Sequence, residues 1–379
     1  MSNPSLPALC HWLAGPLSTD VKNTLERLRQ VPDVVRIAVM PDVHLANEVC
    51  IGTVVATRHS IIPHAVGGDI GCGMAALAFN CQANLLGSAS AAEQLLDALH
   101  QFVPVMRQPR SSVRELPESL LVRVLSDPFL EKLSDRDGRW QLGTLGRGNH
   151  FLEFQEDDAG NLWVMVHSGS RAMGQAIADH HLSAVPPTSS GLRCLEADGY
   201  QGMAYLNDVQ WALAYADANR QCILDSVVGL MLRLFGIEPI LESMTTCHHN
   251  HVQLETHFDQ ALWVHRKGAI EAREGLPGII PGSMGSYSYH VEGRGNPESL
   301  CSSSHGAGRA MDRTSARRAV SEHELHRQLK GIWFDPRLAG KLRDEAPTAY
   351  KDIQEVMRAQ KDLTRIVRRL RPVLCYKGG

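Results

Sequence analysis

The chain lacks any long, uninterrupted run of apolar side chains. Its apolar stretches, such as Ser226 to Leu234, are too short and too interrupted to span a bilayer, so we expect no membrane partner. The first residues, Met1 to Leu13, lack the basic start and apolar core of a secretion signal. The nine cysteines show no paired spacing, which argues against a disulfide framework. These absences favour a cytoplasmic location.

The common nucleotide-binding signatures are also missing. No G-x-x-x-x-G-K-[ST] phosphate loop occurs, and no G-x-G-x-x-G opens a helix after a strand. Gly293-Arg294-Gly295 is followed by Asn296-Pro297, which argues against a helix there. The Lys-x-Asp-Gly stretch of lysine-dependent nucleic-acid ligases is absent as well. If this chain handles a nucleotide covalently, a histidine is the obvious candidate nucleophile.

Overall charge gives no sign of a nucleic-acid-binding protein, because the formal net charge is −3. Basic residues nevertheless gather in two stretches. The first holds Arg309, Arg313, Arg317 and Arg318, and the second holds Arg358, Lys361, Arg365, Arg368, Arg369, Arg371 and Lys377. Such stretches can bind phosphate backbones, but a solvated helix face is the simpler interpretation, and charge alone favours it.

The spacing of apolar residues predicts an α+β fold. Helical patterns cover residues 18–28, 91–102, 119–125, 205–234, 318–333 and 346–370. A buried strand is expected over 34–40, ending at Pro41, and strand-and-turn patterns occupy 143–174 and 263–304. Since no repeat or linker divides the chain, we expect one domain over residues 1–379, with its special residues on glycine-rich connections.

Histidine is the first anomaly, with 18 residues in the chain. Several histidines lie in turn-like segments, namely His44, His150, His167, His249 and His305. Asp69 and Cys72 add a carboxylate and a thiol three residues apart. A lone histidine is more often a hydrogen-bonded core residue, and a lone cysteine is more often a small buried apolar residue. Together, however, imidazole, carboxylate and thiolate suit a borderline divalent metal such as Mn, Fe, Co or Zn.

Glycines beside three of these histidines extend the argument. Glycine lets the backbone approach a ligand closely, and successive free amides in such turns form nests that bind anions. A metal site together with anion nests indicates phosphoryl transfer.

Taken together, these motifs resemble those of the RtcB family of RNA ligases. Eight motifs occur in the family's order, at residues 40–44, 66–74, 143–153, 166–171, 247–250, 265–269, 278–285 and 304–309. One such match is weak, but eight in order are hard to reach by chance. The resemblance implies a single RtcB-like domain with mixed β-sheets, flanking helices and a metal site on glycine-rich loops.

The resemblance also implies roles for individual residues. Two Mn²⁺ ions would be held by Asp69, Cys72, His150, His167 and His249, with the Cys72 thiolate shared between them. His305 would be the nucleophile that takes GMP from GTP. The guanylate site would comprise Asn149, His150, Phe151, Leu152, Glu153, His249, Asn250, Pro281, Gly282, Ser283, Met284, Ser288, Lys377 and the backbone of His305, Gly306, Ala307 and Gly308.

Three of the implied site residues have a clear chemical basis. Glu153 can accept from the two N–H groups on the edge of guanine. Arg171 and Arg309 suit phosphate oxygens through the planar guanidinium fork, although a surface ion pair is the simpler interpretation for either.

The implied reaction joins broken RNA in repair or tRNA splicing. In the family, GMP passes from histidine to an RNA 3′-phosphate, and a 5′-hydroxyl then displaces it. A 2′,3′-cyclic phosphate is first opened by hydrolysis. Histidine suits the covalent step because it is neutral and nucleophilic near pH 7.

This sequence departs from the family pattern at two places. Leu45 to Cys50 stands where the family carries glycines, and Arg147 stands where glycine is common. The chain is also short for the family. These features resemble a shorter bacterial branch linked with release-factor-like protein partners and the repair of ribosomal or transfer RNA.

Two alternatives come from other functional classes. A two-metal phosphoesterase would use the same metal ligands but would need neither a guanine site nor His305 as a nucleophile. A non-catalytic RNA-binding protein would have structural histidines, yet it would gain nothing from the Asp-x-x-Cys pair.

Overall fold

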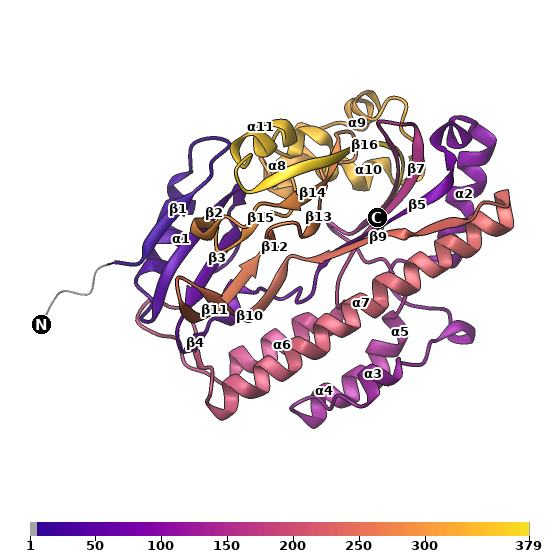
Figure 1. Ribbon diagram of the computed structural model, residues 1–379. Coiled ribbons are helices and arrows are strands. Elements are labelled where there is room, and N and C mark those ends of the chain that lie inside the picture. The colour runs from indigo at the N-terminus through magenta and orange to yellow at the C-terminus, as the bar shows by residue number, and fades with distance from the viewer. Residues whose placement is uncertain (1–5, 379) are drawn as a thin grey trace, which may run out of the picture.

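Two large β-sheets carry the fold in the computed structural model, which describes residues 6–378. A five-stranded sheet has the order β1-β2-β3-β11-β10, and a seven-stranded sheet has the order β13-β14-β16-β6-β7-β5-β9. Two-stranded pairs β12-β15 and β4-β8 are also present. β1 and β2 are parallel, while the other paired strands are antiparallel. The α+β class with mixed sheets and flanking helices is confirmed (Figure 1).

The strands are β1 (Ala8–His11), β2 (Val34–His44), β3 (Ile51–Thr57), β4 (Ser60–Ile61), β5 (Gly73–Gln82), β6 (Phe151–Asp157), β7 (Asn161–Ser168), β8 (Leu195–Glu196), β9 (Pro239–His248), β10 (Asn250–His257), β11 (Gln260–Lys267), β12 (Ala269–Glu271), β13 (Pro277–Ile280), β14 (Ser288–Gly293), β15 (Ser302–Ser304) and β16 (Thr364–Tyr376). The helices are α1 (Thr19–Arg29), α2 (Ala89–Phe102), α3 (Glu118–Leu121), α4 (Pro128–Leu133), α5 (Arg139–Gln141), α6 (Ala172–Ser183), α7 (Tyr200–Phe235), α8 (Arg313–Ala319), α9 (Glu322–Gln328), α10 (Ala339–Leu342) and α11 (Ile353–Ala359). Among residues 6–378, no helix has the length and apolar character needed to cross a membrane. All nine cysteines are free thiols.

The longest helix, α7, joins two parts of the core. Its C-terminal half, including Leu224 and Val227, packs with α2 and the seven-stranded sheet. Its N-terminal half, including Tyr205 and Trp211, packs with α6 and the short helices α3 and α4. Figure 1 shows α7 crossing the molecule beside the sheets, with α8 to α11 on the other side. Each fully buried leucine side chain here contributes about 1.5–3 kcal/mol.

Several predicted helices are confirmed, with boundaries that differ by a few residues. The pattern over 18–28 forms α1, whose Ser18 side chain accepts from the amide of Val21 as expected of a helix cap. The patterns over 91–102 and 205–234 form α2 and α7. The helix expected over 119–125 is a single turn, Glu118–Leu121.

The strand predicted to end at Pro41 is wrong at that boundary, because β2 continues to His44. Its pairing with β3 becomes irregular between Val39 and His44. Proline is tolerated in a strand where the ladder is interrupted, since it has no amide hydrogen to donate. The irregular end of β2 therefore carries the whole 40–44 motif.

The C-terminal part departs most from the sequence prediction. The helix expected over 346–370 is wrong, because only Ile353–Ala359 is α-helical there and Thr364–Tyr376 forms β16. β16 lies between β14 and β6, so pairing with distant strands outweighs the local helical spacing. The helix expected over 318–333 is also wrong as a single unit, since α8 ends at Ala319 and Ser321 caps a separate α9.

The first five residues and Gly379 lie outside the described residues. The segment from Met1 to Leu13, where no secretion signal was predicted, therefore lies partly outside the described residues.

Candidate metal and nucleotide site

Four adjacent strands bring the predicted metal-binding side chains to one edge of the seven-stranded sheet. β6, β7, β5 and β9 are neighbours, and the cross-strand pairs Phe151–His167, Gly73–Ser168 and Gly73–His248 mark a common edge. The predicted ligands lie at or directly beside that edge: Asp69, Cys72, His150, His167 and His249. The antiparallel pairing therefore explains how residues far apart in sequence converge. None of these residues lies on a helix, as the sequence predicted, although His167 belongs to a strand.

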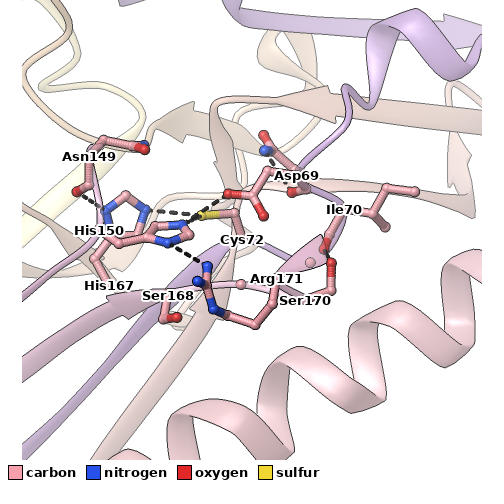
Figure 2. Close-up of polar contacts among 12 residues, drawn as sticks. Asp69, Ile70, Cys72, Asn149, His150, His167, Ser168, Ser170 and Arg171 are labelled. Atoms are coloured by element: carbon pink, nitrogen blue, oxygen red, sulfur yellow. Dashed lines mark hydrogen bonds and ion pairs between the residues drawn. The ribbon is translucent and has the colours of Figure 1, made fainter. Parts of the chain in front are cut away.

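These side chains form two overlapping groups that could each hold a metal ion. One group is Asp69, Cys72 and His150, and the other is Cys72, His167 and His249, with ligand atoms within 4.8 Å of one another. The Cys72 Sγ atom lies 3.3 Å from His150 Nε2 and 3.1 Å from His167 Nε2. Figure 2 shows Asp69, Cys72, His150 and His167 directed toward one another. Cys72 is the member common to both groups.

Hydrogen bonds fix the tautomers of two histidines in this cluster. The Nδ1 atom of His167 donates to the carbonyl oxygen of Asn149 at 3.0 Å. The Nδ1 atom of His249 donates to the side-chain oxygen of Asn250 at 3.2 Å. Each Nε2 atom is left with a lone pair, and the two Nε2 atoms lie 3.0 Å apart. Burial holds the pKa of both histidines well below the usual range, which favours the neutral form that binds metals.

The carboxylate and the thiol of the cluster also fit a cation. Burial alone would raise the pKa of Asp69, but the neighbouring His150 lowers it to about 2, so the carboxylate is ionised. Burial raises the pKa of the Cys72 thiol well above its usual range. A thiolate at this position therefore requires a compensating cation, as metal coordination supplies. The donor set suits a borderline divalent ion.

Arg171 lies beside the cluster in a strained backbone conformation, with a φ of 59° just before α6. Its Nη1 atom is 3.3 Å from His150 Nδ1 (Figure 2). Its Nε atom donates to Thr144 Oγ1 at 3.2 Å. Gly146 packs against both side chains, and a Cβ there would collide with His150 and Arg171. Such strain is found where the surroundings fix a functional residue. Arg171 is thus not the surface ion pair that the sequence left open.

His305 follows β15 and is held by Asp42 on β2. Its Nδ1 atom donates to Asp42 Oδ2 at 2.7 Å, and its backbone amide donates to the same oxygen at 3.2 Å. The Nε2 atom is left unprotonated in the neutral ring, and it has no hydrogen-bond partner among residues 6–378. The ring centroid lies 4.6 Å from that of His249, so His305 adjoins the metal-binding cluster.

Asp42 is a site residue that the sequence analysis missed. It is fully buried and belongs to the 40–44 motif, which was the available signal. Its contact with His305 joins residues 263 positions apart, so only the tertiary fold reveals it. Gly308 makes the approach possible, because it has a φ of 71° and a Cβ there would collide with the Asp42 backbone.

A cavity of about 530 Å³ opens beside His305. Predicted guanylate-site residues line much of it: Asn149, Phe151, Glu153, Pro281, Gly282, Ser283, Met284, Ser288, His305, Gly306, Ala307, Gly308 and Lys377. Four others do not line it. His150 and His249 lie in the metal-binding cluster, and Asn250 donates to the Asp69 carbonyl. The Leu152 side chain points the other way into the core.

Glu153 on β6, Lys377 directly after the neighbouring strand β16, and Glu345 all line the cavity. Burial raises the pKa of Glu153 to about 7. The Lys377 ammonium lies 2.7 Å from a Glu345 carboxylate oxygen and 5.4 Å from the centre of the Phe151 ring. Burial alone would raise the pKa of Glu345, but Lys377 and Arg313 lower it to about 2. The cavity therefore presents a carboxyl group and an ammonium together.

Arginines of the first basic stretch form another part of the cavity wall. Arg309 donates to the carbonyl oxygens of Met311 at 2.9 Å and Asp344 at 2.7 Å. Arg313 contacts Glu345 and also donates to the Asp344 carboxylate. Both arginines line the cavity, so the solvated helix face favoured from charge alone does not describe them. Glu345 was not singled out in the sequence, because nothing local marks it.

The segment that departs from the family pattern borders the same cavity. Leu45 and Asn47 of this segment, together with the preceding His44, are part of its lining. The Nδ1 atom of His44 donates to the carbonyl oxygen of Asp42 at 2.9 Å, and burial lowers the pKa of His44 to about 4. A neutral histidine therefore stands at the cavity wall beside His305.

The comparisons with known proteins agree with this geometry. The sequence model of a family described as tRNA-splicing ligase RtcB matches residues 24–130 and 126–378. The chain belongs to the RtcB family. The match includes the metal-binding cluster, His305 and all residues that line the cavity.

RtcB proteins from distant organisms share nearly the whole chain. The RNA-splicing ligase RtcB of Escherichia coli (strain K12) is 38% identical over 399 residues, which cover 97% of this chain and 96% of that protein. The RNA-splicing ligase RtcB of Mycobacterium tuberculosis is 31% identical, with 92% and 98% covered. The tRNA-splicing ligase RtcB of Archaeoglobus fulgidus is 30% identical, with 90% and 87% covered. The resemblance stated from the sequence motifs is confirmed.

Proposed function

We propose that this RtcB-family chain is a GTP- and Mn²⁺-dependent RNA ligase. It joins an RNA 3′-phosphate or 2′,3′-cyclic phosphate end to a 5′-hydroxyl end, in RNA repair or tRNA splicing, through GMP bound covalently to His305. The observation that carries the proposal is the Nε2 atom of His305, which has no hydrogen-bond partner within the described part of the chain and lies at the wall of a cavity of about 530 Å³ beside the metal-binding cluster. The family membership supports action on RNA.

Asp69, Cys72, His150, His167 and His249 would hold two Mn²⁺ ions, with Cys72 shared. When bound, such ions neutralise phosphate charge and polarise phosphoryl oxygens.

In the first step His305 Nε2 attacks the α-phosphorus of GTP. A nitrogen–phosphorus bond forms, the bond to the β-phosphate oxygen breaks, and pyrophosphate leaves. The ring acquires positive charge as the bond forms, and the Asp42 carboxylate at 2.7 Å stabilises it. The same carboxylate keeps the proton on Nδ1, so that Nε2 carries the lone pair.

The next step takes place at the same phosphorus, and the final step takes place at the RNA 3′-phosphorus. An oxygen of the RNA 3′-phosphate attacks it, the bond to His305 breaks, and the RNA end becomes a diphosphate capped with guanosine. The 5′-hydroxyl oxygen of the second RNA then attacks the 3′-phosphorus, loses its proton and releases GMP. His305 is already free again from the preceding transfer, in which its bond to phosphorus breaks.

Glu153 and Lys377, which both line the cavity, suit guanine. Glu153 can accept from the N1–H and N2–H groups, and Lys377 can donate to O6. Arg171 and Arg309 remain candidates for contacts with phosphate oxygens, because each guanidinium lies beside the metal-binding cluster or the cavity.

A two-metal phosphoesterase is the second candidate, since the metal-binding cluster would serve it equally well. The cavity favours the ligase, because a hydrolase would need neither the carboxylate–ammonium pair nor the Asp42–His305 pair. A cytoplasmic location and a release-factor-like partner remain proposals drawn from the sequence.

The test is an end-joining assay with RNA bearing a 3′-phosphate and a 5′-hydroxyl. We expect joined RNA only when GTP and Mn²⁺ are both present, and an acid-labile, alkali-stable protein adduct with α-labelled GTP. Release of inorganic phosphate without joining or adduct would instead indicate the phosphoesterase. Binding of RNA with neither reaction would indicate a non-catalytic protein.

A further inference from the structure

We propose that Cys375 is a positioning residue that orients the Glu153 carboxylate for guanine, with Gln155 acting on the same group from the other side. The inference rests on the proposed guanine site and adds a determinant of base specificity to it.

The contacts place one donor on each carboxylate oxygen. Cys375 Sγ lies 2.8 Å from Glu153 Oε2, and Gln155 Nε2 donates to Oε1 at 2.7 Å. Glu153 and Cys375 are directly opposed in the β6–β16 pairing, so the thiol reaches the carboxylate across the ladder. All three side chains are buried. Bulk water therefore cannot replace either donor.

Alternation along β16 selects which side chains reach the cavity. Cys375 and Lys377 line it, whereas Tyr376 between them points into the core and donates to the Val103 carbonyl at 2.8 Å. An irregularity in the pairing between Pro372 and Leu374 sets this register. The thiol on β16 and the ammonium directly after its end thus reach the cavity from the same side of the chain.

The number of acceptor sites explains the effect on specificity. An ionised carboxylate offers about four lone-pair positions. The thiol and the Gln155 amide occupy two, which leaves one on each oxygen of Glu153 for the cavity. Guanine presents two adjacent donors, N1–H and N2–H, that match two neighbouring acceptors. Adenine presents an acceptor at N1, which a fixed carboxylate repels.

Within the described residues, the Cys375 thiol has two hydrogen-bond acceptors, of which Glu153 is the nearer. Burial raises the pKa of Cys375 well above its usual range, so it stays protonated and acts as the donor. Its other acceptor is the Met284 carbonyl oxygen, at 3.6 Å. Without the thiol, Glu153 Oε2 would lose its donor and the carboxyl plane could rotate. Protonation of Glu153 would also become easier, and a protonated carboxyl donates where guanine needs an acceptor.

The test compares Cys375→Ala, which removes the donor, with Cys375→Ser, which keeps one. Cys222→Ala is the matched control, since Cys222 lies on α7, packs against a core cluster there and does not line the cavity. The affinities for GMP and AMP are measured by calorimetry with no added metal, and GTP and ATP are compared as adduct donors. We expect Cys375→Ala to weaken GMP binding roughly tenfold, as for a lost hydrogen bond to a charged group, and to leave AMP binding unchanged. Cys375→Ser should stay within about threefold of the parent protein.

Equal preference for GMP over AMP in the parent protein and in Cys375→Ala would overturn the inference, as would a Cys375→Ser variant that behaves like Cys375→Ala. Gln155→Leu tests the same carboxylate from its other oxygen if Cys375→Ala lowers the melting temperature, and it too should reduce the preference. A parent protein that binds GMP no better than AMP would contradict the guanine site of the proposed function itself.

Discussion

Single hydrogen bonds decide which nitrogen of each site histidine is free. Asp42 takes the Nδ1 proton of His305, Asn149 takes that of His167, and Asn250 takes that of His249. In each neutral ring the lone pair then lies on Nε2, the atom available to a metal ion or to a phosphorus atom. The three acceptors therefore help to set the protonation pattern of the site.

Asp42→Asn tests this role for His305. The amide can donate to Nδ1 and move the ring proton to Nε2, and it cannot stabilise positive charge on the ring. By analogy with other carboxylate–histidine pairs, we expect adduct formation to slow by roughly 10²- to 10⁴-fold. Metal content should not change, which elemental analysis checks. Adduct formation at the parent rate would show that Asp42 only supports the fold.

Cys72→Ser tests the sharing of one sulfur by two metal-binding groups. The serine hydroxyl stays protonated and binds borderline metals poorly, so we expect manganese content after equilibrium dialysis to fall far more than in any other single cysteine variant. Cys50→Ser is the matched control, because Cys50 is also fully buried but lies in another core cluster. Equal metal content in the two variants would remove Cys72 from the ligand set.

At this scale the sequence motifs predicted which residue types would gather, and the structure brings all five of the proposed metal ligands together. Partners such as Asp42 and Glu345 were missed, since their contacts join distant segments. Leu152 is the opposite case, a residue that the motif assigned to the site but that does not line the cavity. Its motif includes it, but alternation along β6 turns its side chain into the core.

Among the elements, β16 shows how one strand can carry two kinds of ion pair. Its exposed part holds Arg365 and Arg369, which pair with Glu292 and Asp158 of neighbouring segments. Directly beyond its C-terminal end lies Lys377, whose pair with Glu345 is buried, with side chains only 3% and 4% exposed. The part of the second basic stretch from Arg365 to Arg371 thus lies on a strand, with charges that are partly neutralised, whereas Arg358 lies on α11.

The two kinds of pair should respond differently to mutation. Lys377→Ala leaves the Glu345 carboxylate buried with one cation fewer, and we expect a loss of about 3 kcal/mol of stability together with weaker GTP use. Arg365→Ala combined with Arg369→Ala should change the melting temperature by less than about 2 °C and leave the adduct yield unchanged, because solvent screens exposed pairs. Thermal unfolding and labelling of both variants measure this contrast. Similar losses in both would contradict it.

The elements also show where local patterns mislead. The spacing over 205–234 predicted α7 because that helix buries apolar residues along its whole length. The spacing over 346–370 failed because β16 gains its stability from β14 and β6, which are distant in sequence. The expectation of one domain over residues 1–379 stays a prediction.

For the whole molecule, the state of Glu153 predicts a pH dependence of nucleotide choice. Burial raises its pKa from 4.5 to about 7, so the carboxyl is protonated below that pH and ionised above it. Preference for GTP over ATP should therefore rise between about pH 6 and pH 8, and Glu153→Gln should abolish the rise. The same shift means that this group makes the fold less stable as the pH rises from about 4.5 to about 7. A pH-independent ratio in the parent protein would contradict the role of Glu153.

The central claim is that His305 carries GMP, and the most direct measurement locates the nucleotide on the chain. The parent protein and His305→Ala are incubated with GTP and Mn²⁺, digested at alkaline pH, and analysed by mass spectrometry. We expect GMP on His305 of the parent protein and none on the variant, with equal metal content and melting temperature in both. GMP attached to another residue, or to the His305→Ala variant, would contradict it.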